Sequence, residues 1–163
     1  MIPYAPKTVL ITGATGDFGH AFANNFAALR CKLILHARPE DKLAEMAKKF
    51  STPVYTSCFD MTDRSAMEAA LANLPDQFHH IDLLINNAGG AFGMDKAQDS
   101  NLDDWDAMVN LNVLGLVRMT RLVLGGMASR KNGHIINIGS TAGNYPYPGG
   151  HVYCASKAFV KQF

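Results

Sequence analysis

Short apolar segments alternate with longer amphipathic segments along almost the whole chain, and this alternation constrains the fold most strongly. The apolar segments are expected to be strands, at residues 7–12, 32–36, 53–58, 81–86 and 134–138. Helices are expected from the end of the 13–19 loop to about residue 29, over 40–50, 60–74 and 100–130, and from about residue 150 onward. Alternating strands and helices indicate a parallel sheet covered on both faces. Right-handed crossovers then give a doubly wound, three-layer α/β fold of the Rossmann type.

Composition narrows the classes of protein that such a chain can belong to. Its 163 residues suffice for one domain with a sizeable core, and we expect residues 1–163 to form a single domain. The formal net charge of +1 gives no basic surface for nucleic acid and no polybasic patch for a membrane. No run is expected to be long enough to span a bilayer, and residues 1–7 lack the features of a signal peptide.

Cysteine usage points to a reducing compartment. The three cysteines, Cys31, Cys58 and Cys154, are far apart and odd in number. This pattern favours free thiols in a cytoplasmic protein over disulfides or a metal site.

A glycine-rich loop follows the first predicted strand, and the chain there reads Thr-Gly-Ala-Thr-Gly-Asp-Phe-Gly over residues 12–19. Glycines permit a tight turn and a close approach of the backbone to a pyrophosphate, while the helix start supplies free N–H groups. The alternative is a turn that only connects two elements. The position of the glycine-rich loop, directly after the first strand of an alternating pattern, favours dinucleotide binding.

The end of the second predicted strand bears on the choice of dinucleotide. NAD sites usually place an acid there, whereas an arginine accommodates the extra phosphate of NADP. The residues here are His36, Ala37 and Arg38, without an acid. Arg38 therefore favours NADP over NAD, and the alternative is a solvated arginine in a loop.

Three polar residues near the end of the sequence suit proton transfer. Tyr153 and Lys157 are four positions apart on a predicted helix and so share a face, and Ser140 follows the fifth predicted strand. A free tyrosine has a pKa of about 10, and a nearby cation favours the phenolate. The pair could move a proton to or from an alcohol or carbonyl oxygen held by the serine hydroxyl. A surface Tyr–Lys pair is the simpler reading of the spacing alone.

Together the motifs resemble those of the short-chain dehydrogenase/reductase family. The glycine loop, Asn-Asn-Ala-Gly at 86–89, Asn-Val-Leu-Gly at 112–115, Ser140 and the Tyr153/Lys157 pair occur in the family's order, from about Thr8 to the last residue. Within the family the chain is similar to NADP-dependent 3-hydroxy acid dehydrogenases that oxidise serine and allo-threonine.

The resemblance implies a role for each motif. Tyr153 would be the general acid/base, Lys157 would favour its phenolate and hold the nicotinamide ribose, and Ser140 would orient the substrate oxygen. Asn112 would position a water in a proton relay, or else be an amide that bonds to backbone. Asp60 and the Met61 backbone would contact the adenine, with a helix N-cap as the alternative for Asp60. The remaining cofactor contacts would come from Gly13, Ala14, Thr15, Gly16, Asp17, Phe18, Gly19, Asn87, Ala88 and Gly89.

Two features depart from the family pattern. Asp17 stands where the middle glycine of the loop is usual; it can cap the following helix, but it also places a carboxylate near phosphates. Members of the family are also longer than this chain, so we expect the 163 residues to be part of a longer enzyme, cut after the fifth strand and within the catalytic helix.

These readings predict an NADP-dependent oxidoreductase acting on a small alcohol or carbonyl compound, such as serine or allo-threonine. The alternatives are a reductase of a 3-oxoacyl thioester, ketone or sugar, or a dinucleotide-binding module without turnover. The resemblance further implies a homotetramer whose interface uses the helix from about Ser100 and the helix with Tyr153.

Overall fold

Five parallel strands form the sheet of the computed structural model, which describes residues 5–163. They are β1 (Thr8–Thr12), β2 (Lys32–Ala37), β3 (Val54–Cys58), β4 (Leu83–Asn86) and β5 (His134–Asn137). Each bound lies within two residues of the expected one, so the strands predicted from apolar segments are confirmed. Residues 1–4, part of the opening segment without signal-peptide features, lie outside the described residues.

The strand order β3-β2-β1-β4-β5 creates one change of direction in the sheet. The chain moves outward from β1 to β3 and then returns to the other side of β1 with β4. Ile11 of β1 thus pairs with Leu35 of β2 and with Ile85 of β4. Ligands of doubly wound sheets bind outside the carboxyl ends of the strands where the direction changes, which here is the space between β1 and β4. The predicted Rossmann-like α/β fold is confirmed.

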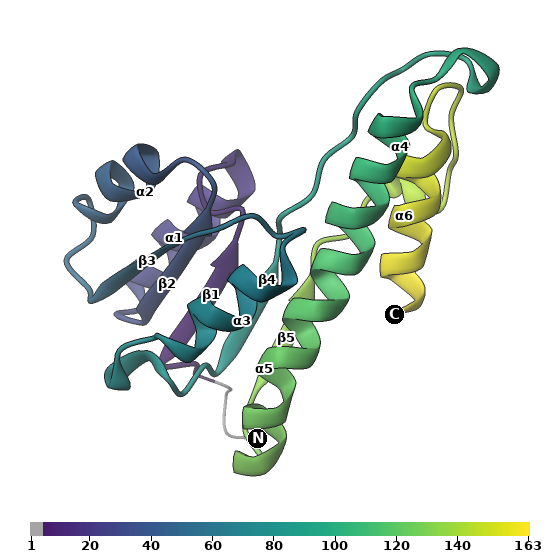
Figure 1. Cartoon of the computed structure of the whole chain (residues 1–163). Coiled ribbons are helices and arrows are strands. Elements are labelled where there is room, and N and C mark those ends of the chain that lie inside the picture. Colours follow the sequence, from purple (N-terminus) through teal and green to yellow (C-terminus); the bar gives the residue numbers. More distant parts are fainter. Residues whose placement is uncertain (1–4) are drawn as a thin grey trace.

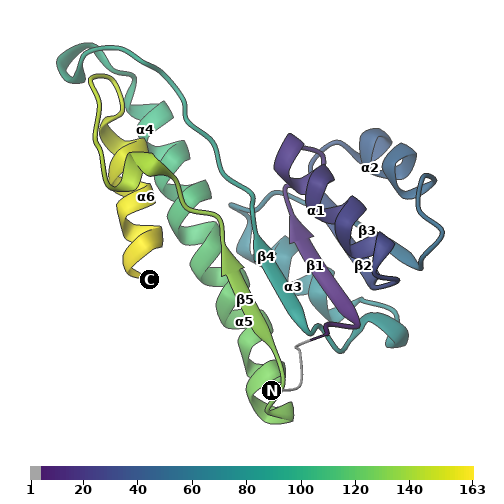
Figure 2. The same cartoon turned by 180° about the vertical axis from the view of Figure 1, so that it is seen from behind.

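Helices cover both faces of this sheet (Figures 1 and 2). α1 (Asp17–Ala28) and α2 (Glu40–Ala47) pack on one face, and α3 (Arg64–Ala72) and α5 (Leu116–Arg130) pack on the other. Successive strand residues point to opposite faces, so Val9 and Ile11 join the cluster under α1 and α2, whereas Leu10 joins the cluster under α3 and α5. All five residues of β1 are buried, as expected for a central parallel strand.

One continuous helix is made of α4 (Leu102–Val109), a π-helical segment (Asn110–Gly115) and α5. By length and composition it could cross a membrane, which corrects the expectation that no run approaches that length. Its residues Met119, Val123 and Met127 are buried against the sheet, and a core helix of this kind passes the same test.

The residues Ser-Asn-Leu-Asp over 100–103 resemble a capping box that begins at Ser100, but this helix starts differently. Asn101 is the N-cap, and its side-chain oxygen accepts a hydrogen bond of 2.9 Å from the Asp103 N–H. The Ser100 hydroxyl instead donates to the Lys96 carbonyl at 3.0 Å. The helix was therefore expected correctly, but its cap was placed one residue too early.

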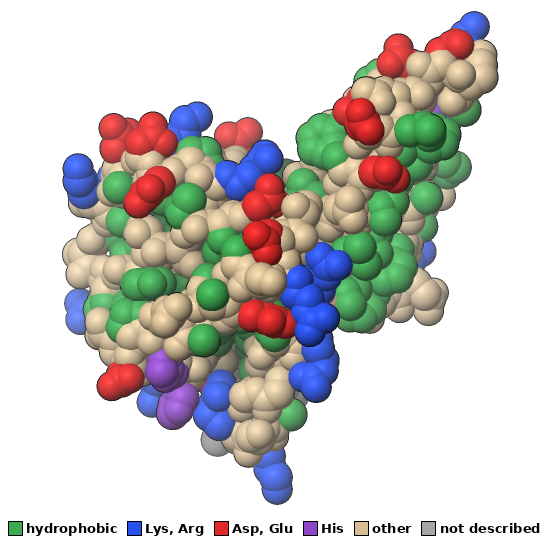
Figure 3. Space-filling view, viewed as in Figure 1, with side chains coloured by type: hydrophobic (Ala, Val, Ile, Leu, Met, Phe, Trp, Pro, Cys, Tyr) green, Lys and Arg blue, Asp and Glu red, His purple; other side chains and the backbone are tan. Residues whose placement is uncertain are grey.

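An arm projects from the body of the molecule where α4 and α6 (His151–Gln162) lie side by side (Figure 1). The loops that lead into them meet at its tip, where His151 Nε2 lies 3.1 Å from the Asp95 carbonyl oxygen. Hydrophobic side chains gather on the arm (Figure 3). Exposed apolar residues of these helices are Leu102, Val109, Phe159 and Phe163, the last directly after α6. The arm therefore leaves apolar surface in contact with solvent.

Candidate active site

The glycine loop after β1 is fastened to the segment that follows β4. The Thr12 hydroxyl accepts hydrogen bonds from the backbone N–H groups of Asn87 and Ala88, both at 3.0 Å. The Asn87 side-chain amide donates in turn to the carbonyl oxygens of Thr12 and Gly13, both at 3.0 Å. Asn87 thus holds the loop in addition to lining the space above it. The role of Thr12 was missed, although a hydroxyl directly before the loop's first glycine was visible in the sequence.

Two of the three loop glycines are required by the space around them. Gly13 has φ +64°, and a Cβ there would lie 3.0 Å from the Ala88 Cα. A Cβ at Gly19 would lie only 2.3 Å from the Gly13 carbonyl oxygen, so α1 packs directly on the loop. At Gly16 the nearest atom would be 3.6 Å away, which is an ordinary contact.

Asp17 is the first residue of α1 and does not cap the helix as expected. The N-cap is Gly16, which has no side chain to bond the free N–H groups of the first turn. The exposed Asp17 carboxylate interacts favourably with the positive end of the helix dipole. It also lines the cavity described next, where it would repel a phosphate group bound at the same helix end.

A cavity of about 800 Å³ lies at the carboxyl ends of β1, β2 and β4. This volume is within the usual range for a small-molecule site. Most of the predicted cofactor residues line it: Gly13, Thr15, Gly16, Asp17, Phe18, Arg38, Asp60, Met61, Asn87, Ala88 and Gly89. Ala14 and Gly19 are buried behind the loop and do not belong to the lining. They support the loop from behind, and a contact of either residue with the cofactor stays a prediction.

Arg38 supplies a positive charge to this cavity. It follows β2 directly, and its backbone carbonyl accepts a hydrogen bond of 2.9 Å from the Cys58 thiol. His36 and Ala37 complete the end of β2, so no acid faces the cavity from this strand. A guanidinium in this place fits a phosphate group better than a pair of ribose hydroxyls.

The segment between β3 and α3 forms another wall. The Asp60 Oδ1 accepts hydrogen bonds from the Thr62 N–H and hydroxyl, both at 2.8 Å, and the backbone N–H in particular lowers the pKa of the Asp60 carboxyl. Asp63 caps α3 by accepting from the Ala66 N–H at 3.0 Å. The alternative role of Asp60 as the helix N-cap is therefore wrong.

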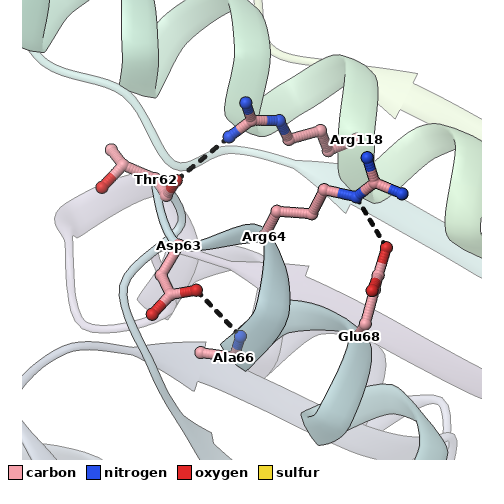
Figure 4. Close-up of polar contacts among 6 residues, drawn as sticks. All are labelled: Thr62, Asp63, Arg64, Ala66, Glu68 and Arg118. Atoms are coloured by element: carbon pink, nitrogen blue, oxygen red, sulfur yellow. Dashed lines mark hydrogen bonds and ion pairs between the residues drawn. The ribbon is translucent and has the colours of Figure 1, made fainter.

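Helix α5 braces the same segment from outside. Arg118 donates a hydrogen bond of 3.0 Å to the Thr62 carbonyl, as Figure 4 shows. A Cβ at Gly115 would lie 3.1 Å from the Met61 carbonyl oxygen, so the helix approaches this backbone closely. Met61 itself is buried, with 3% of its surface exposed. The Met61–Thr62 backbone is thus held between the core and α5.

Asn112 ties three parts of the site together. It lies in the π-helical segment with 1% of its surface exposed. Its amide accepts from the Gly90 N–H and donates to the Gly90 carbonyl, both at 2.9 Å, and also donates to the Ser156 hydroxyl at 3.0 Å. The expected bonding of Asn112 to backbone is present, with a partner 22 residues away; a relay through it stays a prediction.

Tyr153 and Lys157 share a face of α6, as their spacing predicted. The Lys157 Nζ lies 5.9 Å from the centroid of the Tyr153 ring and donates to the Ile138 carbonyl at 2.9 Å. Lys157 is 7% exposed, and burial lowers the pKa of its ammonium group. The positive charge is held next to the half-buried phenol and away from bulk water.

Ser140 follows β5 at the same edge of the sheet. Its hydroxyl accepts a hydrogen bond of 3.1 Å from the Ala142 N–H and caps the short 3₁₀ turn Thr141–Gly143. A Cβ at Gly143 would lie 2.7 Å from the Lys157 carbonyl oxygen, so this turn packs against α6. The packing places the Ser140 turn against the helix that carries the Tyr–Lys pair.

Gly89 connects the cavity with the polar residues of α6. It lines the cavity, and a Cβ in its place would lie 3.1 Å from Asn112 Oδ1 and 3.4 Å from Lys157 Nζ. Asn112, Ser140, Tyr153 and Lys157 are not part of the cavity lining itself. Asn112 and the Lys157 ammonium therefore lie directly beside Gly89, at one end of the cavity.

Comparison with known proteins agrees with this arrangement. The family model described as short chain dehydrogenase matches residues 7–163. An NADP-dependent 3-hydroxy acid dehydrogenase from Escherichia coli is 47% identical over 155 residues, which are 95% of this chain and 62% of that protein. Sulfoacetaldehyde reductase 2 from Chromohalobacter salexigens is 46% identical over 158 residues, 95% of this chain and 63% of that protein. The chain thus spans somewhat less than two thirds of these relatives.

Solved structures give the same result. The crystal structure of serine dehydrogenase from Escherichia coli is 47% identical and superposes with a TM-score of 0.93 over 96% of this chain and 72% of that chain. The closed form of serine dehydrogenase complexed with NADP+ gives the same TM-score and identity, over 96% of this chain and 63% of that chain. With the family model matching all but the first six residues, the chain belongs to the short-chain dehydrogenase family.

Proposed function

We propose that this chain forms the dinucleotide-binding and catalytic part of an NADP-dependent oxidoreductase that interconverts a small alcohol and its carbonyl compound. The observation that carries the proposal is the Tyr153–Lys157 pair on α6, whose Lys157 ammonium lies beside Gly89 of the cavity wall. Relatives that are 47% identical are NADP-dependent, which supports the choice of cofactor.

The cavity fits NADP by its shape and its donors. The close packing of Gly13 on Ala88 leaves a backbone cradle, and the uncapped N–H groups of α1 face a pyrophosphate placed there. Arg38 would bind the additional phosphate on the adenosine ribose, and Asp60 with the Met61 backbone would contact the adenine. When bound, the nicotinamide supplies the hydride acceptor or donor of the reaction.

The residues of α6 would manage the proton. Tyr153 would take the proton of the substrate hydroxyl during oxidation and return it during reduction. The buried Lys157 ammonium stabilises the phenolate that forms, because charges interact strongly where water is excluded. Ser140 would orient the reacting oxygen, and Asn112 would connect Lys157 to solvent through a water.

For the substrate we propose a 3-hydroxy acid such as serine or allo-threonine. Two proteins that are 47% identical are named a 3-hydroxy acid dehydrogenase and a serine dehydrogenase, which supports this class. A small aldehyde is a second candidate, because sulfoacetaldehyde reductase 2 is 46% identical over a similar length. Other reductases of the family, acting on ketones, sugars or 3-oxoacyl thioesters, and a dinucleotide-binding module without turnover are the further alternatives.

A substrate panel tests the proposal. Serine, allo-threonine and other 3-hydroxy acids are offered with NADP, and sulfoacetaldehyde, ketones and 3-oxoacyl thioesters with NADPH, while absorbance follows the reduced cofactor. We expect the highest kcat/KM with a 3-hydroxy acid. Turnover of thioesters or aldehydes alone would replace the substrate class, and NADPH binding with no turnover of any compound would favour the binding module.

Tyr153→Phe is the matched control for the chemistry. The substitution removes one oxygen atom and keeps the ring beside Lys157. We expect NADPH to bind as before while turnover falls at least about a thousandfold, which is the scale of a lost general acid/base with its electrostatic partner. A purified variant with wild-type turnover would remove Tyr153 from the mechanism.

We further propose that the protein is cytoplasmic and assembles as a homotetramer through the arm. The exposed Leu102, Val109 and Phe159 would be covered in such an assembly. Sedimentation analysis of the protein and of Phe159→Asp would test this, since a monomer in both cases contradicts an assembly through the arm.

A further inference from the structure

His36 is a buried histidine at the wall of the cavity that the mechanism above does not use. Its side chain is 2% exposed at the end of β2, and it belongs to the cavity lining. Its Nε2 lies 3.0 Å from the Phe59 carbonyl oxygen, and its ring packs on the Phe59 ring with centroids 4.0 Å apart. A histidine so enclosed is held in one orientation.

The hydrogen bond defines which nitrogen carries the proton. A carbonyl oxygen only accepts, so Nε2 must be the N–H that donates to Phe59. Nδ1 is buried without a hydrogen-bond partner, and a proton there would have no acceptor. His36 is therefore neutral, and one of its two nitrogens makes its only side-chain hydrogen bond within the described residues 5–163.

His36 joins two walls of the cavity that are far apart in the sequence. Its backbone carbonyl accepts a hydrogen bond of 2.8 Å from the Ala14 N–H in the glycine loop. Its side chain holds Phe59, which directly precedes the Asp60–Met61 pair. The Phe59 carbonyl thus lies at hydrogen-bond distance from His36, and the Thr62 carbonyl accepts a hydrogen bond from Arg118. Between them, the Met61 carbonyl lies close to the backbone of Gly115. Of His36, Gly115 and Arg118, only His36 also lines the cavity.

We propose that His36 is a positioning residue of the dinucleotide site, whose Nε2–H fixes the Phe59 carbonyl and thereby the Asp60–Met61 backbone that receives the adenosine end of the cofactor. The proposal rests on the proposed binding of NADP. His36 acts through Phe59, so its loss should weaken the adenosine end and leave the nicotinamide end unchanged. The side chain needs only one donor at the Nε2 position, because Nδ1 has no partner to lose.

A pair of substitutions of nearly equal size separates the donor from the volume. His36→Gln places an amide N–H where Nε2 lies, whereas His36→Met has a similar length and no donor. Leu33→Ala is the control for stability, because Leu33 is a fully buried residue of the same strand that faces the opposite cluster. Calorimetry measures the dissociation constants of NADPH, adenosine 2′,5′-bisphosphate and reduced nicotinamide mononucleotide, and thermal unfolding measures Tm.

We expect His36→Met to raise the dissociation constants of NADPH and adenosine 2′,5′-bisphosphate by about tenfold. The constants of His36→Gln should stay within about threefold of the wild-type values. Leu33→Ala should lower Tm without changing either constant. Equal affinities in His36→Met and wild type, or equal losses in the Gln and Met variants, would overturn the proposal. Wild-type protein that binds none of the three ligands would instead overturn the proposed function.

Nuclear magnetic resonance of the wild-type protein gives a test that needs no variant. The His36 Nε2–H should exchange slowly with water, and its resonance should shift when adenosine 2′,5′-bisphosphate saturates the site. A resonance that does not move at saturation would contradict the positioning role.

Discussion

The cavity formed by the glycine loop and the Tyr153 face of α6 are built in different ways. Around the cavity, backbone groups of distant loops bond to one another through Thr12 and Asn87, and close packing at Gly13 and Gly19 sets the shape. On α6, the side chain of Lys157 is buried beside a half-buried phenol, and a single backbone carbonyl holds it in place.

The cavity thus depends on its shape, whereas the α6 face depends on a buried charge. The cavity would hold a pyrophosphate mainly through backbone atoms, so a change in the path of the chain should impair it more than most single side-chain changes. The α6 face depends on two functional groups, so it should keep its fold and lose its chemistry when either group is removed. Substitutions in the two regions can break or refine this contrast.

Lys157→Met should reduce turnover by about a thousandfold, equivalent to about 4 kcal/mol, because the charge beside the Tyr153 ring is lost. The methionine retains most of the buried volume. Steady-state oxidation of the best alcohol substrate gives the measurement. Lys161→Met on the exposed side of α6 is the control and should keep turnover. Similar losses in both variants would show that α6 acts through its packing.

Gly19→Ala should destabilise the fold by about 3 kcal/mol or more, because a Cβ there would lie 2.3 Å from the Gly13 carbonyl oxygen. Gly16→Ala is the matched control, with its nearest contact at 3.6 Å, and should cost less than about 1 kcal/mol. Urea unfolding measures both. Equal stabilities of the two variants would mean that the loop can move away from α1.

Stability should decrease as pH falls from about 6.5 to about 4, in part because of His36. Burial lowers the pKa of His36 from 6.5 to about 4, so below pH 6.5 the unfolded chain binds a proton that the folded protein excludes. The stabilisation is fully present above pH 6.5, and up to about 3 kcal/mol is lost by pH 4.

Comparison with His36→Gln isolates this contribution. Urea midpoints of wild type and variant are measured between pH 7.5 and pH 4, and the wild type should lose stability faster. Parallel curves for the two proteins would show that His36 titrates alike in the folded and unfolded states.

Arg38→Gln should weaken the binding of NADPH about thirtyfold, or by about 2 kcal/mol, and leave the affinity for NADH almost unchanged. The guanidinium lines the cavity after β2, where no acid is present to bind ribose hydroxyls. Fluorescence titration with both cofactors gives the ratio. If the binding of both cofactors weakens equally, the charge of Arg38 attracts any anionic ligand to the cavity and does not select the extra phosphate of NADPH.

Asp17→Asn should tighten NADPH binding by about three- to fivefold at low salt, because a carboxylate at the start of α1 faces the site of the pyrophosphate. The gain should shrink as salt is added. Asp41→Asn in the first turn of α2 is the control, because Asp41 is not part of the cavity lining. Weaker binding by Asp17→Asn would show that the carboxylate aids the cradle.

Much of the fold was predictable because its determinants are local. The short apolar or β-branched segments indicated the five strands, although only β1, β2 and β4 are largely buried, and the spacing of helices between the strands implied parallel pairing. The glycine loop, Arg38 and the Tyr153–Lys157 pair were also found from the sequence, since each is defined by short-range spacing or by its place after a strand. Helix caps were less predictable: Asn101 and Asp63 cap helices where Ser100 and Asp60 were considered.

The hydrogen bonds between these local elements could not be predicted, because they depend on how distant segments approach one another in the folded protein. Thr12 bonds to Asn87 and Ala88, which follow it by 75 and 76 residues, because β1 and β4 are neighbours in the sheet. Asn112 meets Gly90, and His36 meets Phe59, through similar approaches of distant loops. Periodicity along a chain indicates which face of an element is buried, and so the elements and their layers followed from the residues alone. Which polar groups face each other depends on strand order and register, and these exist only once the whole sheet has formed.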